Sequence, residues 1–582
     1  MRLNKTQIRL FLKFLKYLLP YRKKLFLILL LGGACVLLGL VIPYLSKLVV
    51  DTAILEKDFK VFMVLGVIGT CVFILNGLLS AMADLLKRGL LLKVKFDLNK
   101  RLFEHFQELP IGFFQDKSTG EFMFKISHDI DGAVDFIVNI PEEFVKTIPK
   151  LFLILGILFY LDWLMALFAL VLVPILYVPV YFLTQRMRRI LEILFDDSEN
   201  IFKRMEEMFS HMYLVKAFGK EKQETRNYLR ILIANLRIRL KNIRLEVLNS
   251  FAGEAFKRVV VGMITLFGGY LVIKGKMSTG TLVAVMLYMA QLVGLQSSLG
   301  IFFQRIVFGL VSCQRIDGIF QEKSKFQVIP GMEDKKKITI DHPQIEFKRI
   351  SFGYKPGEYI LKNIDFKIDN GFIALTGPSG CGKTTLINLI LKLHEPWEGT
   401  ILFDGYDSAG LDYSLLRKQI GVALQDPFLW NDTIENNIRY GRENASHEEI
   451  IESARVACVN KFVQSFPQGY ATIIGENACK LSEGQKQKIA IARAWIKKPK
   501  ILILDEAMSA MDSASEERIL LNMKKNQSSA DVAWIVVSHR LSTVKNADLV
   551  YFLSRSDTMI LDSPANLLEK NREFAELFAG QV

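Results

Sequence analysis

The stretch ALTGPSGCGKTTLINLILKL, residues 374–393, joins an apolar strand to an apolar helix through a glycine-rich loop. Residues 377–384 fit the pattern G-x-x-x-x-G-K-[ST], in which backbone amides cradle phosphate groups at a helix N-terminus. We expect Lys383 to reach the outer two phosphates and the Thr384 hydroxyl to ligate Mg²⁺. The remaining candidate phosphate-binding residues of this loop are Gly377, Ser379, Gly380, Cys381, Gly382 and Thr385. We interpret Cys381 as a small residue in a tight loop rather than as a redox sensor.

Three further strand ends carry polar residues that complete a phosphate-transfer site. The run PKILILDEAMSAMD (499–512) predicts a buried parallel strand ending in Asp505, which can hold Mg²⁺, and Glu506, which can polarise a water for attack on the γ-phosphate. In VAWIVVSHR (532–540), His539 can donate a hydrogen bond to the γ-phosphate or to the leaving product. In IGVALQDPFLW (420–430), Gln425 follows a strand and can sense Mg²⁺ or water. Ligands bind at this edge of parallel sheets, which favours catalytic roles for Glu506, His539 and Gln425.

The segment before the glycine loop predicts the start of the same domain. QIEFKRISFGY (344–354) predicts a strand and its return, and it follows the charged linker MEDKKKITIDH. Tyr354 offers a ring on which adenine can stack, although an isolated tyrosine is more often a packing residue. We expect a linker at 321–343 and a nucleotide-binding domain over 344–582.

The first half of the chain is far more apolar. The 582 residues are 51% hydrophobic, with a mean hydropathy of +0.26, and runs of about 20 apolar residues all lie before residue 310. Six membrane spans are predicted, at about 25–46, 61–83, 144–161, 163–182, 252–273 and 281–303. They define a transmembrane domain over residues 1–320, with both termini on one side.

The connections between the spans alternate in length. Those following spans one, three and five are short, whereas 83–144 and 182–252 are long, charged and helix-periodic, which predicts helices that project far into the cytosol. Lys146 and Lys150 lie inside a span, where a lysine either snorkels to the interface or faces a cavity and contacts an anionic part of the cargo. Both interpretations remain open.

The net charge of +14 does not indicate nucleic-acid binding, because the basic residues flank the apolar runs in the positive-inside pattern. The six cysteines have no metal-binding spacing and indicate free thiols in a reducing compartment. The stretch KLSEGQKQKIAIAR (480–493) predicts a helix that begins near Ser482 and Gly484.

These motifs together resemble the ATP-binding cassette (ABC) exporters, of the half-transporter, multidrug and lipid-flippase type. The resemblance rests on GPSGCGKTT (377–385), Gln425, LSEGQ (481–485), ILILDE (501–506), SAMD (509–512) and His539 in their order, and it covers nearly the whole chain. Residues 113–131 and 212–228 are similar to the coupling regions of such exporters. IIGENACK, with Glu476, is similar to their cross-linking loop. The implied fold is a six-helix membrane domain with long cytosolic extensions, followed by an α/β P-loop ABC ATPase domain.

The resemblance also implies a dimer. In that family the signature loop LSEGQ closes over the nucleotide of the partner subunit, so Ser482, Gly484, Gln485 and Asp512 join the candidate ATP-binding residues. Glu483 departs from the family pattern, in which this position is usually glycine. We expect its carboxylate to point away from the γ-phosphate, the alternative being an impaired site. Met508 and Met511 also depart and are interpreted as neutral packing changes. Complete motifs favour a homodimer and leave a heterodimer open.

The implied activity is export or flipping of an amphiphilic lipid, drug or peptide by alternating access, with Mg²⁺-dependent ATP hydrolysis at the dimer interface. The alternatives are an ATP-gated channel, a regulatory ABC protein or one half of a heterodimeric exporter. The six spans argue against a soluble P-loop ATPase. The expected location is a bacterial inner membrane, with the nucleotide-binding domain and both termini cytoplasmic, and an organelle remains an alternative.

Overall fold

The structure is a computed structural model that describes residues 5–115, 122, 125–322, 340–475, 478–526, 532–555 and 558–581. Contacts divide the chain into two units, Met1–Leu109 with Phe113–Lys325 and Pro110–Gly112 with Phe326–Val582. Each unit is described by itself. Most of the predicted linker 321–343 lies outside the described residues.

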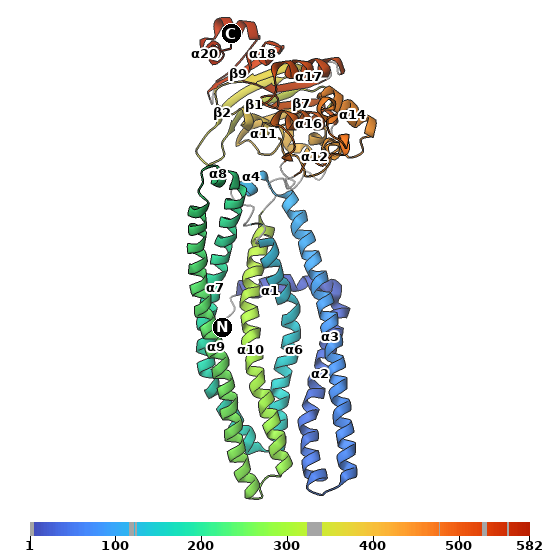
Figure 1. Ribbon diagram of the computed structural model, residues 1–582, viewed down its shortest axis with the longest axis vertical. Coiled ribbons are helices and arrows are strands. Elements are labelled where there is room, and N and C mark those ends of the chain that lie inside the picture. Colours follow the sequence, from blue (N-terminus) through green and yellow to red (C-terminus); the bar gives the residue numbers. More distant parts are fainter. Residues whose placement is uncertain are drawn as a thin grey trace. The chain divides into compact units, whose positions relative to one another are not determined.

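The first unit is entirely helical in its described part. Its principal helices are α1 (Lys5–Leu15), α2 (Arg22–Leu48), α3 (Phe59–Glu108), α6 (Ile130–Leu161), α7 (Trp163–Ser210), α9 (Glu221–Ile273) and α10 (Thr279–Gln321). Shorter helical segments are η1 (Lys16–Tyr21), η2 (Val49–Ile54), α4 (Ile111–Gln115), η3 (Lys125–Asp129) and α8 (Met212–Ala217). Within this unit α2 packs on α3, α7 on α9, and α10 on α6 (Figure 1).

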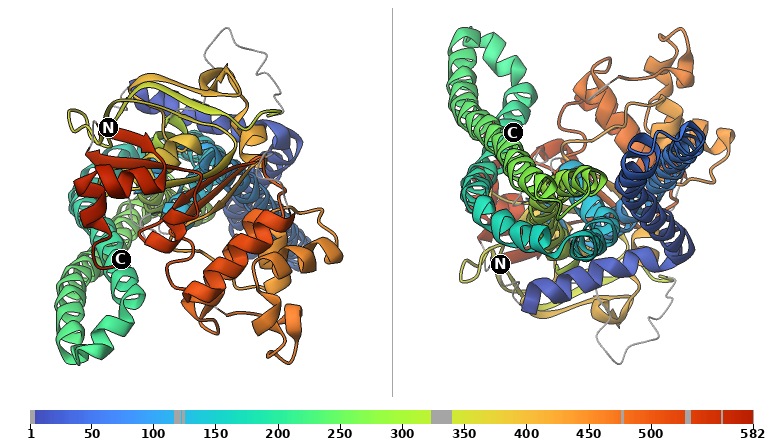
Figure 2. Two further views of the ribbon diagram at one scale, coloured as in Figure 1. Left: turned by 90° about the horizontal axis from the view of Figure 1, so that it is seen from above. Right: turned by 90° about the horizontal axis from the view of Figure 1, so that it is seen from below.

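Each predicted span falls inside one of the six long helices α2, α3, α6, α7, α9 and α10. Among the described residues, four helical stretches are long and apolar enough to cross a membrane: Arg9–Ile54, Phe59–Glu108, Ile126–Leu161 and Glu221–Ile273. Seen end-on from below, the α2–α3 pair and the α7–α9 pair lie on opposite sides of α6 and α10 (Figure 2).

The abrupt turn between α6 and α7 is built by one residue. Asp162 adopts an extended conformation, and its Oδ1 accepts a hydrogen bond of 2.9 Å from the Met165 amide, which caps α7. The predicted long extensions follow from helices that continue well past the apolar spans, since α3 contains 50 residues and α9 contains 53. At a rise of about 1.5 Å per residue, these helices are more than twice as long as a bilayer core requires.

The second unit is an α/β domain with two sheets. The six-stranded sheet has the order β10-β9-β3-β8-β7-β6, in which β9, β3, β8, β7 and β6 are parallel and β10 is antiparallel. Its strands are β3 (Gly371–Thr376), β6 (Ile420–Ala423), β7 (Ile501–Asp505), β8 (Ala533–Val537), β9 (Leu549–Arg555) and β10 (Thr558–Asp562). The second sheet, β2-β1-β4-β5, is antiparallel, with β1 (Ile345–Phe352), β2 (Leu361–Ile368), β4 (Glu398–Phe403) and β5 (Tyr406–Asp407).

One strand prediction was wrong in detail. Residues 344–354 do not contain a strand and its return, because Ile345–Phe352 is one continuous strand and its partner β2 begins at Leu361. The register slips between Phe347 and Ile350, and again between Ile350 and Phe352. These bulges bend the strand without reversing it.

Helices cover the six-stranded sheet and complete its core. They are α11 (Lys383–Ile390), α12 (Tyr413–Lys418), α13 (Ile434–Arg439), α14 (His447–Val456), α15 (Asn460–Val463), α16 (Glu483–Trp495), α17 (Ser513–Asn526), α18 (Leu541–Lys545), α19 (Pro564–Lys570) and α20 (Arg572–Leu577). Alternate residues of β7 enter different cores: Leu502 and Leu504 face the cluster formed with α14, α16 and α17, whereas Ile501 and Ile503 face the cluster formed with α11 and the antiparallel sheet. A strand buried on both faces explains the continuous aliphatic run.

Candidate functional site

The predicted strand-end residues meet at one edge of the six-stranded sheet. Leu375 of β3 pairs with Val537 of β8, and Val537 also pairs with Asp505 of β7. The three parallel strands therefore end at one level, and the glycine loop, Glu506 and His539 follow them directly. Leu504 pairs with Ala423 of β6, which brings Gln425 to the same edge two residues later. This is where doubly wound folds bind their ligands.

The side chain of Lys383 bonds to the backbone of its own glycine loop. Lys383 Nζ donates to the carbonyls of Gly377 at 2.9 Å and Pro378 at 3.0 Å, and its side chain is buried. Gly382, with φ of +109°, caps α11 and has Leu361 Cδ2 2.8 Å from the position a Cβ would take. A side chain at this position would be strained and would also clash, so the turn into the helix requires glycine.

Two further candidates lie beside this loop. The Tyr354 hydroxyl is 3.4 Å from Thr385 Oγ1 and accepts a hydrogen bond of 3.3 Å from Asn388 Nδ2 on α11. Tyr354 is about half exposed (46%), so it is accessible to a stacking partner. Burial raises the pKa of the Cys381 thiol, so this residue is a poor thiolate, in agreement with its interpretation as a packing residue.

Asp505, Glu506 and His539 form the acidic end of the site. Asp505 is buried, and this burial, together with the neighbouring Glu506 carboxylate, raises its pKa to about 6, while Lys383 and the Thr384 hydroxyl act in the opposite direction. Glu506 has a left-handed backbone with φ of +47°, which is uncommon for a residue of this size. His539 Nε2 lies 3.1 Å from Glu506 Oε1. Backbone strain of this kind is often found at functional sites.

The donors around Asp505 suit a magnesium ion. Thr384 provides a hydroxyl that hydrogen-bonds to the buried Asp505 carboxylate, and Gln425 is an exposed amide after the neighbouring strand. Oxygen ligands of this type, completed by water and phosphate oxygens, are what Mg²⁺ prefers. A cation would also offset the negative charges of the buried Asp505 and of the neighbouring, partly exposed Glu506.

The loop that carries Gln425 is fixed by residues that sequence reasoning missed. Arg493, on α16, donates to the Phe428 carbonyl at 2.7 Å, to the Asn437 carbonyl at 2.9 Å and to Asn437 Oδ1 at 2.9 Å. Its burial lowers the pKa of the guanidinium to about 10. The fully buried Asn437 in turn exchanges two hydrogen bonds with the Trp430 backbone. The Gln425 loop is therefore attached to the helix that begins at the signature motif.

The predicted helix start at the signature is confirmed. Ser482 is the N-cap of α16: its Oγ accepts from the Gln485 amide at 3.3 Å, and Gln485 Oε1 accepts from the Ser482 amide at 2.9 Å. This reciprocal capping box requires both side chains and fixes the orientation of the helix N-terminus. Gly484 has the Ala510 carbonyl oxygen 3.0 Å from the position a Cβ would take, so the signature loop packs tightly on the segment SAMD.

The signature residues and Asp512 line one hollow of about 320 Å³. Its other lining residues include Lys461 and Lys488, whose ammonium groups favour an anion. The Ser515 side chain, and after it the Ser515 amide that donates to Asp512 Oδ1 at 2.8 Å, lower the pKa of Asp512. No residue of the glycine loop lines this hollow in the described part of the domain. A phosphate bound by the glycine loop of the same chain is therefore not bound here.

Glu483 does not line the hollow. Its carboxylate makes an ion pair of 2.8 Å with Lys486 one turn along α16, and its side chain is 65% exposed. A carboxylate in the first turn also interacts favourably with the helix dipole. This geometry agrees with the expectation that the Glu483 carboxylate points away from the bound γ-phosphate.

We expect Glu483→Gly to change ATP turnover by less than about tenfold, because the side chain is directed to solvent and its exposed ion pair contributes little energy. The measurement is the steady-state ATPase rate of the purified chain in lipid vesicles, and Lys486→Ala serves as a control that breaks the same pair from the other side. A much larger rise in the glycine variant would show that the native signature is impaired.

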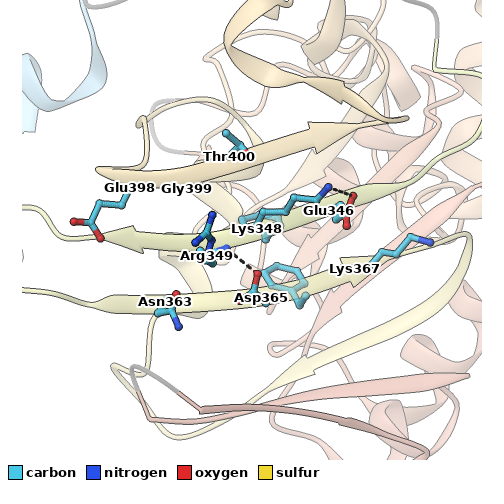
Figure 3. Close-up of a pocket in the computed structure, with 11 residues that line it drawn as sticks. Glu346, Lys348, Arg349, Asn363, Asp365, Lys367, Glu398, Gly399 and Thr400 are labelled. Carbon is cyan, nitrogen blue, oxygen red and sulfur yellow. Dashed lines mark hydrogen bonds and ion pairs between the residues drawn. The ribbon is translucent and has the colours of Figure 1, made fainter.

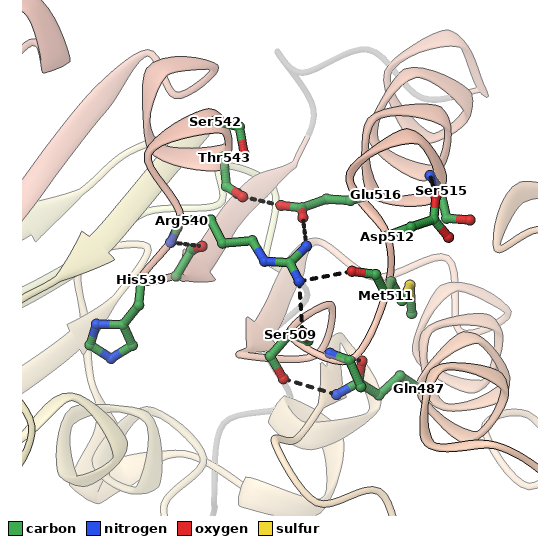
Figure 4. Close-up of polar contacts among 12 residues, drawn as sticks. Gln487, Ser509, Met511, Asp512, Ser515, Glu516, His539, Arg540, Ser542 and Thr543 are labelled. Atoms are coloured by element: carbon green, nitrogen blue, oxygen red, sulfur yellow. Dashed lines mark hydrogen bonds and ion pairs between the residues drawn. The ribbon is translucent and has the colours of Figure 1, made fainter. Parts of the chain in front are cut away.

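A second cluster connects the His539 segment to SAMD (Figure 4). Arg540 donates to Glu516 at 2.6 Å, to the Ser509 carbonyl at 2.7 Å and to the Met511 carbonyl at 2.8 Å. Glu516 is buried and also accepts from the Thr543 hydroxyl. Gln487 of α16 completes the cluster, since its amide bonds to Ser509 Oγ and to the Ala510 amide, both at 3.1 Å. Sequence reasoning named none of these side chains.

A larger hollow of about 890 Å³ lies on the sheet of β1, β2 and β4 (Figure 3). Lys348 and Glu346 neutralise each other in an ion pair of 3.3 Å, and the Arg349 amide donates a hydrogen bond of 2.8 Å to Asp365. It shares no residue with the glycine loop or the signature. Size alone therefore does not identify the nucleotide site in this domain.

In the helical unit, Lys146 forms an ion pair of 2.6 Å with Glu142, a buried residue that also pairs with Lys87 at 3.1 Å. The lysine charge is thus compensated by an acid one turn away, which sequence reasoning did not consider. Of the predicted coupling regions, residues 116–121 and 123–124 lie outside the described residues, as does Glu476 of the predicted cross-linking loop.

A glycine loop, an acidic strand end and a capped signature helix on one α/β domain, preceded by long apolar helices, define an ABC transporter. Family models for the ABC transporter transmembrane region and the ABC transporter match residues 25–296 and 361–509. The chain therefore belongs to the ABC transporter family. It is 30% identical to the ATP-dependent lipid A-core flippase of Syntrophus aciditrophicus, over 92% of this chain and 88% of that protein.

Two further relatives cover nearly the whole length. A putative multidrug export ATP-binding/permease protein of Staphylococcus aureus is 30% identical over 98% of this chain and 99% of its own. The solved structure of a bacterial Atm1-family ABC exporter with ATP bound matches with a TM-score of 0.85 at 27% identity, covering 97% of this chain and 99% of that one. The predicted fold class is confirmed. The protein is a multi-pass membrane ABC exporter that binds and hydrolyses ATP to drive export.

Proposed function

We propose that the protein works as a homodimer that exports or flips an amphiphilic lipid or drug across a bacterial inner membrane, with the nucleotide-binding domain and both termini cytoplasmic. The single observation that supports the proposed dimer is the hollow lined by Ser482, Gly484 and Asp512, which is separate from the glycine loop of its own chain. A second copy can bring its glycine loop to this hollow. Two equivalent composite sites would then form, each built from the glycine loop of one chain and the signature hollow of the other.

In this proposal each residue has a distinct role. The amides of the glycine loop and Lys383 bind the phosphates, Tyr354 stacks on adenine, and the partner's signature closes the site. Thr384, Asp505 and Gln425 would hold Mg²⁺, which offsets the negative charge of the phosphates. Glu506 polarises the attacking water. His539, whose Nε2 lies 3.1 Å from Glu506 Oε1, donates a hydrogen bond to the γ-phosphate.

The proposed class of cargo is inferred from the names of two relatives and from the charges within the membrane spans. The flippase and the multidrug exporter among the relatives are named for a lipid and for drugs. Lys146 is paired with Glu142, so the cation most suggestive of an anionic head group is already neutralised. We therefore propose an amphiphile recognised mainly through apolar contact. Stimulation of ATP hydrolysis by a panel of lipids, drugs and peptides in vesicles tests this point.

Composite sites can be tested by mixing two defective chains. Lys383→Ala removes the phosphate-binding ammonium, and Ser482→Arg fills the signature hollow, so each variant alone should lose most ATP turnover. A mixed dimer, purified through a different tag on each chain, retains one site with an intact Lys383 and an intact partner Ser482. We expect the mixed dimer to regain hydrolysis that neither variant shows alone.

The outcomes separate the alternatives. If each site lies within one chain, the mixed dimer stays as inactive as its parents, and the composite arrangement is wrong. If the wild-type chain alone has no turnover in lipid vesicles under any condition, either a partner chain is missing or Glu483 disables the signature. Turnover in Glu483→Gly alone would show the second, and its absence would show a heterodimer.

A further inference from the structure

The described chain ends in a short segment that folds back on the nucleotide-binding domain. Phe574 and Phe578, in and after α20, are fully buried with ring centroids 5.1 Å apart, and Phe574 also contacts Phe552 of β9. The amide of Gln581 then donates to the Phe578 carbonyl at 2.8 Å. Although the Gln581 side chain is near the surface, its backbone is therefore anchored within three residues of the core.

The Gln581 side chain makes two hydrogen bonds to one short stretch of main chain. Its Nε2 donates to the His539 carbonyl at 2.9 Å, and its Oε1 accepts from the Leu541 amide at 2.9 Å. The primary amide thus pairs with the backbone on both sides of Arg540, as a neighbouring strand would. Arg540 is held separately, by its own amide bonding to Ser538 Oγ at 3.0 Å and by its guanidinium bonding to SAMD.

This arrangement matters because His539 is close to Glu506. The His539 ring is 37% exposed and Nε2 lies 3.1 Å from Glu506 Oε1, while the residue belongs to no helix or strand. A side chain on an irregular segment keeps its position only if its main chain is fixed. A displacement of about 1 Å at a catalytic group can lower the rate by as much as a hundredfold.

We propose that Gln581 is a positioning residue for His539. Its side-chain amide fixes the His539–Leu541 backbone by two hydrogen bonds and thereby positions the imidazole beside Glu506. The inference rests on the proposed role of His539. It assigns a function in ATP hydrolysis to the C-terminal segment, which lies outside the stretch matched by the ABC transporter family model.

The first test is the kinetic effect of Gln581→Ala in the full-length protein in lipid vesicles. We expect kcat for ATP hydrolysis to fall about tenfold while KM for ATP changes by less than about twofold, because Gln581 positions His539, which acts on nucleotide that is already bound. Gln581→Glu keeps an acceptor for the Leu541 amide but loses the donor to the His539 carbonyl, so it should behave like the alanine variant. Arg572→Ala, which breaks an exposed ion pair with Glu576 on α20, is the control and should keep wild-type kinetics.

The second test combines the variant with His539→Ala. If Gln581 acts through His539, the double variant should be no slower than His539→Ala alone, since effects of residues that act as a unit do not add. Hydrogen exchange of the Leu541 amide, measured by mass spectrometry of the same proteins, should speed up in Gln581→Ala and not in Arg572→Ala. This measurement reports the two hydrogen bonds of Gln581 to the His539–Leu541 backbone independently of ATP hydrolysis.

Wild-type kcat in Gln581→Ala with a strongly impaired His539→Ala would overturn the positioning role and leave the role of His539 intact. A multiplicative loss in the double variant would show that Gln581 acts elsewhere. Wild-type turnover in His539→Ala would instead refute the catalytic role of His539, and the positioning role with it.

Discussion

The Glu506→Gln protein is expected to bind ATP with near-normal affinity and to hydrolyse it at least about a hundredfold more slowly than the wild type. Glu506 is the carboxylate that follows β7 directly at the edge where the glycine loop and His539 also emerge. The amide of glutamine preserves the size of the side chain but cannot accept a proton from the attacking water. The groups that would bind the phosphates, Lys383 and the loop amides, are untouched.

The measurement pairs two assays on the same vesicles: phosphate release for turnover and equilibrium binding of a fluorescent ATP analogue for affinity. Glu517→Gln is a matched control, because Glu517 is an exposed acid on α17 that belongs to none of the site motifs. Undiminished hydrolysis by Glu506→Gln would remove Glu506 as the polarising base. Loss of both binding and turnover would point to a folding defect at the strained φ of +47°.

The site motifs could be predicted from the sequence because each of them is local. The glycine loop, the acid pair after β7 and the signature each depend on neighbouring residues: a strand, a turn and a helix start. The spacing within LSEGQ predicted the helix start at Ser482, although not the reciprocal bond between Ser482 and Gln485. The convergence of the strand ends required only the rule that parallel strands end at one edge of a sheet.

The supporting contacts could not be predicted because they join residues that are distant in sequence and ordinary in type. Arg493 holds a carbonyl 65 positions earlier, and Gln581 holds one 42 positions earlier. A glutamine near a chain end carries no signal of its partner. The strand and return predicted within 344–354 failed because the stretch is one strand: Arg349 has a left-handed backbone, with φ of +49°, and lies where the pairing register with β2 shifts.

The Arg540→Ala protein is expected to lose stability as well as activity. Glu516 has 5% of its side chain exposed, and without Arg540 it would keep only the Thr543 hydroxyl as a partner. Leaving a buried carboxylate without its counter-charge costs about 2–3 kcal/mol here, below the usual value because Arg540 itself is a third exposed. For a domain of this size the loss lowers the Tm by roughly 5–10 °C.

The unfolding of this domain can be followed in the full chain by tryptophan fluorescence, because Trp397, Trp430, Trp495 and Trp534 all lie in it and Trp163 is the remaining tryptophan of the sequence. Arg518→Ala is the control, since Arg518 is an exposed cation on α17. The double variant with Arg540→Ala and Glu516→Gln should be more stable than Arg540→Ala alone, because it removes the buried charge and keeps an acceptor for Thr543. If both unfold at the same temperature, the ion pair is not the source of the loss.

Arg540→Lys separates the charge from the hydrogen bonds to SAMD. A lysine ammonium can stay near Glu516, so most of the stability should return, but it lacks the planar fork with which arginine bonds Glu516, the Ser509 carbonyl and the Met511 carbonyl together. The segment before Asp512 would then be held less firmly against the signature helix. We therefore expect Arg540→Lys to melt close to the wild type and yet to hydrolyse ATP several-fold more slowly. Full activity in this variant would mean that Arg540 serves the fold of the domain and not the placement of the signature hollow.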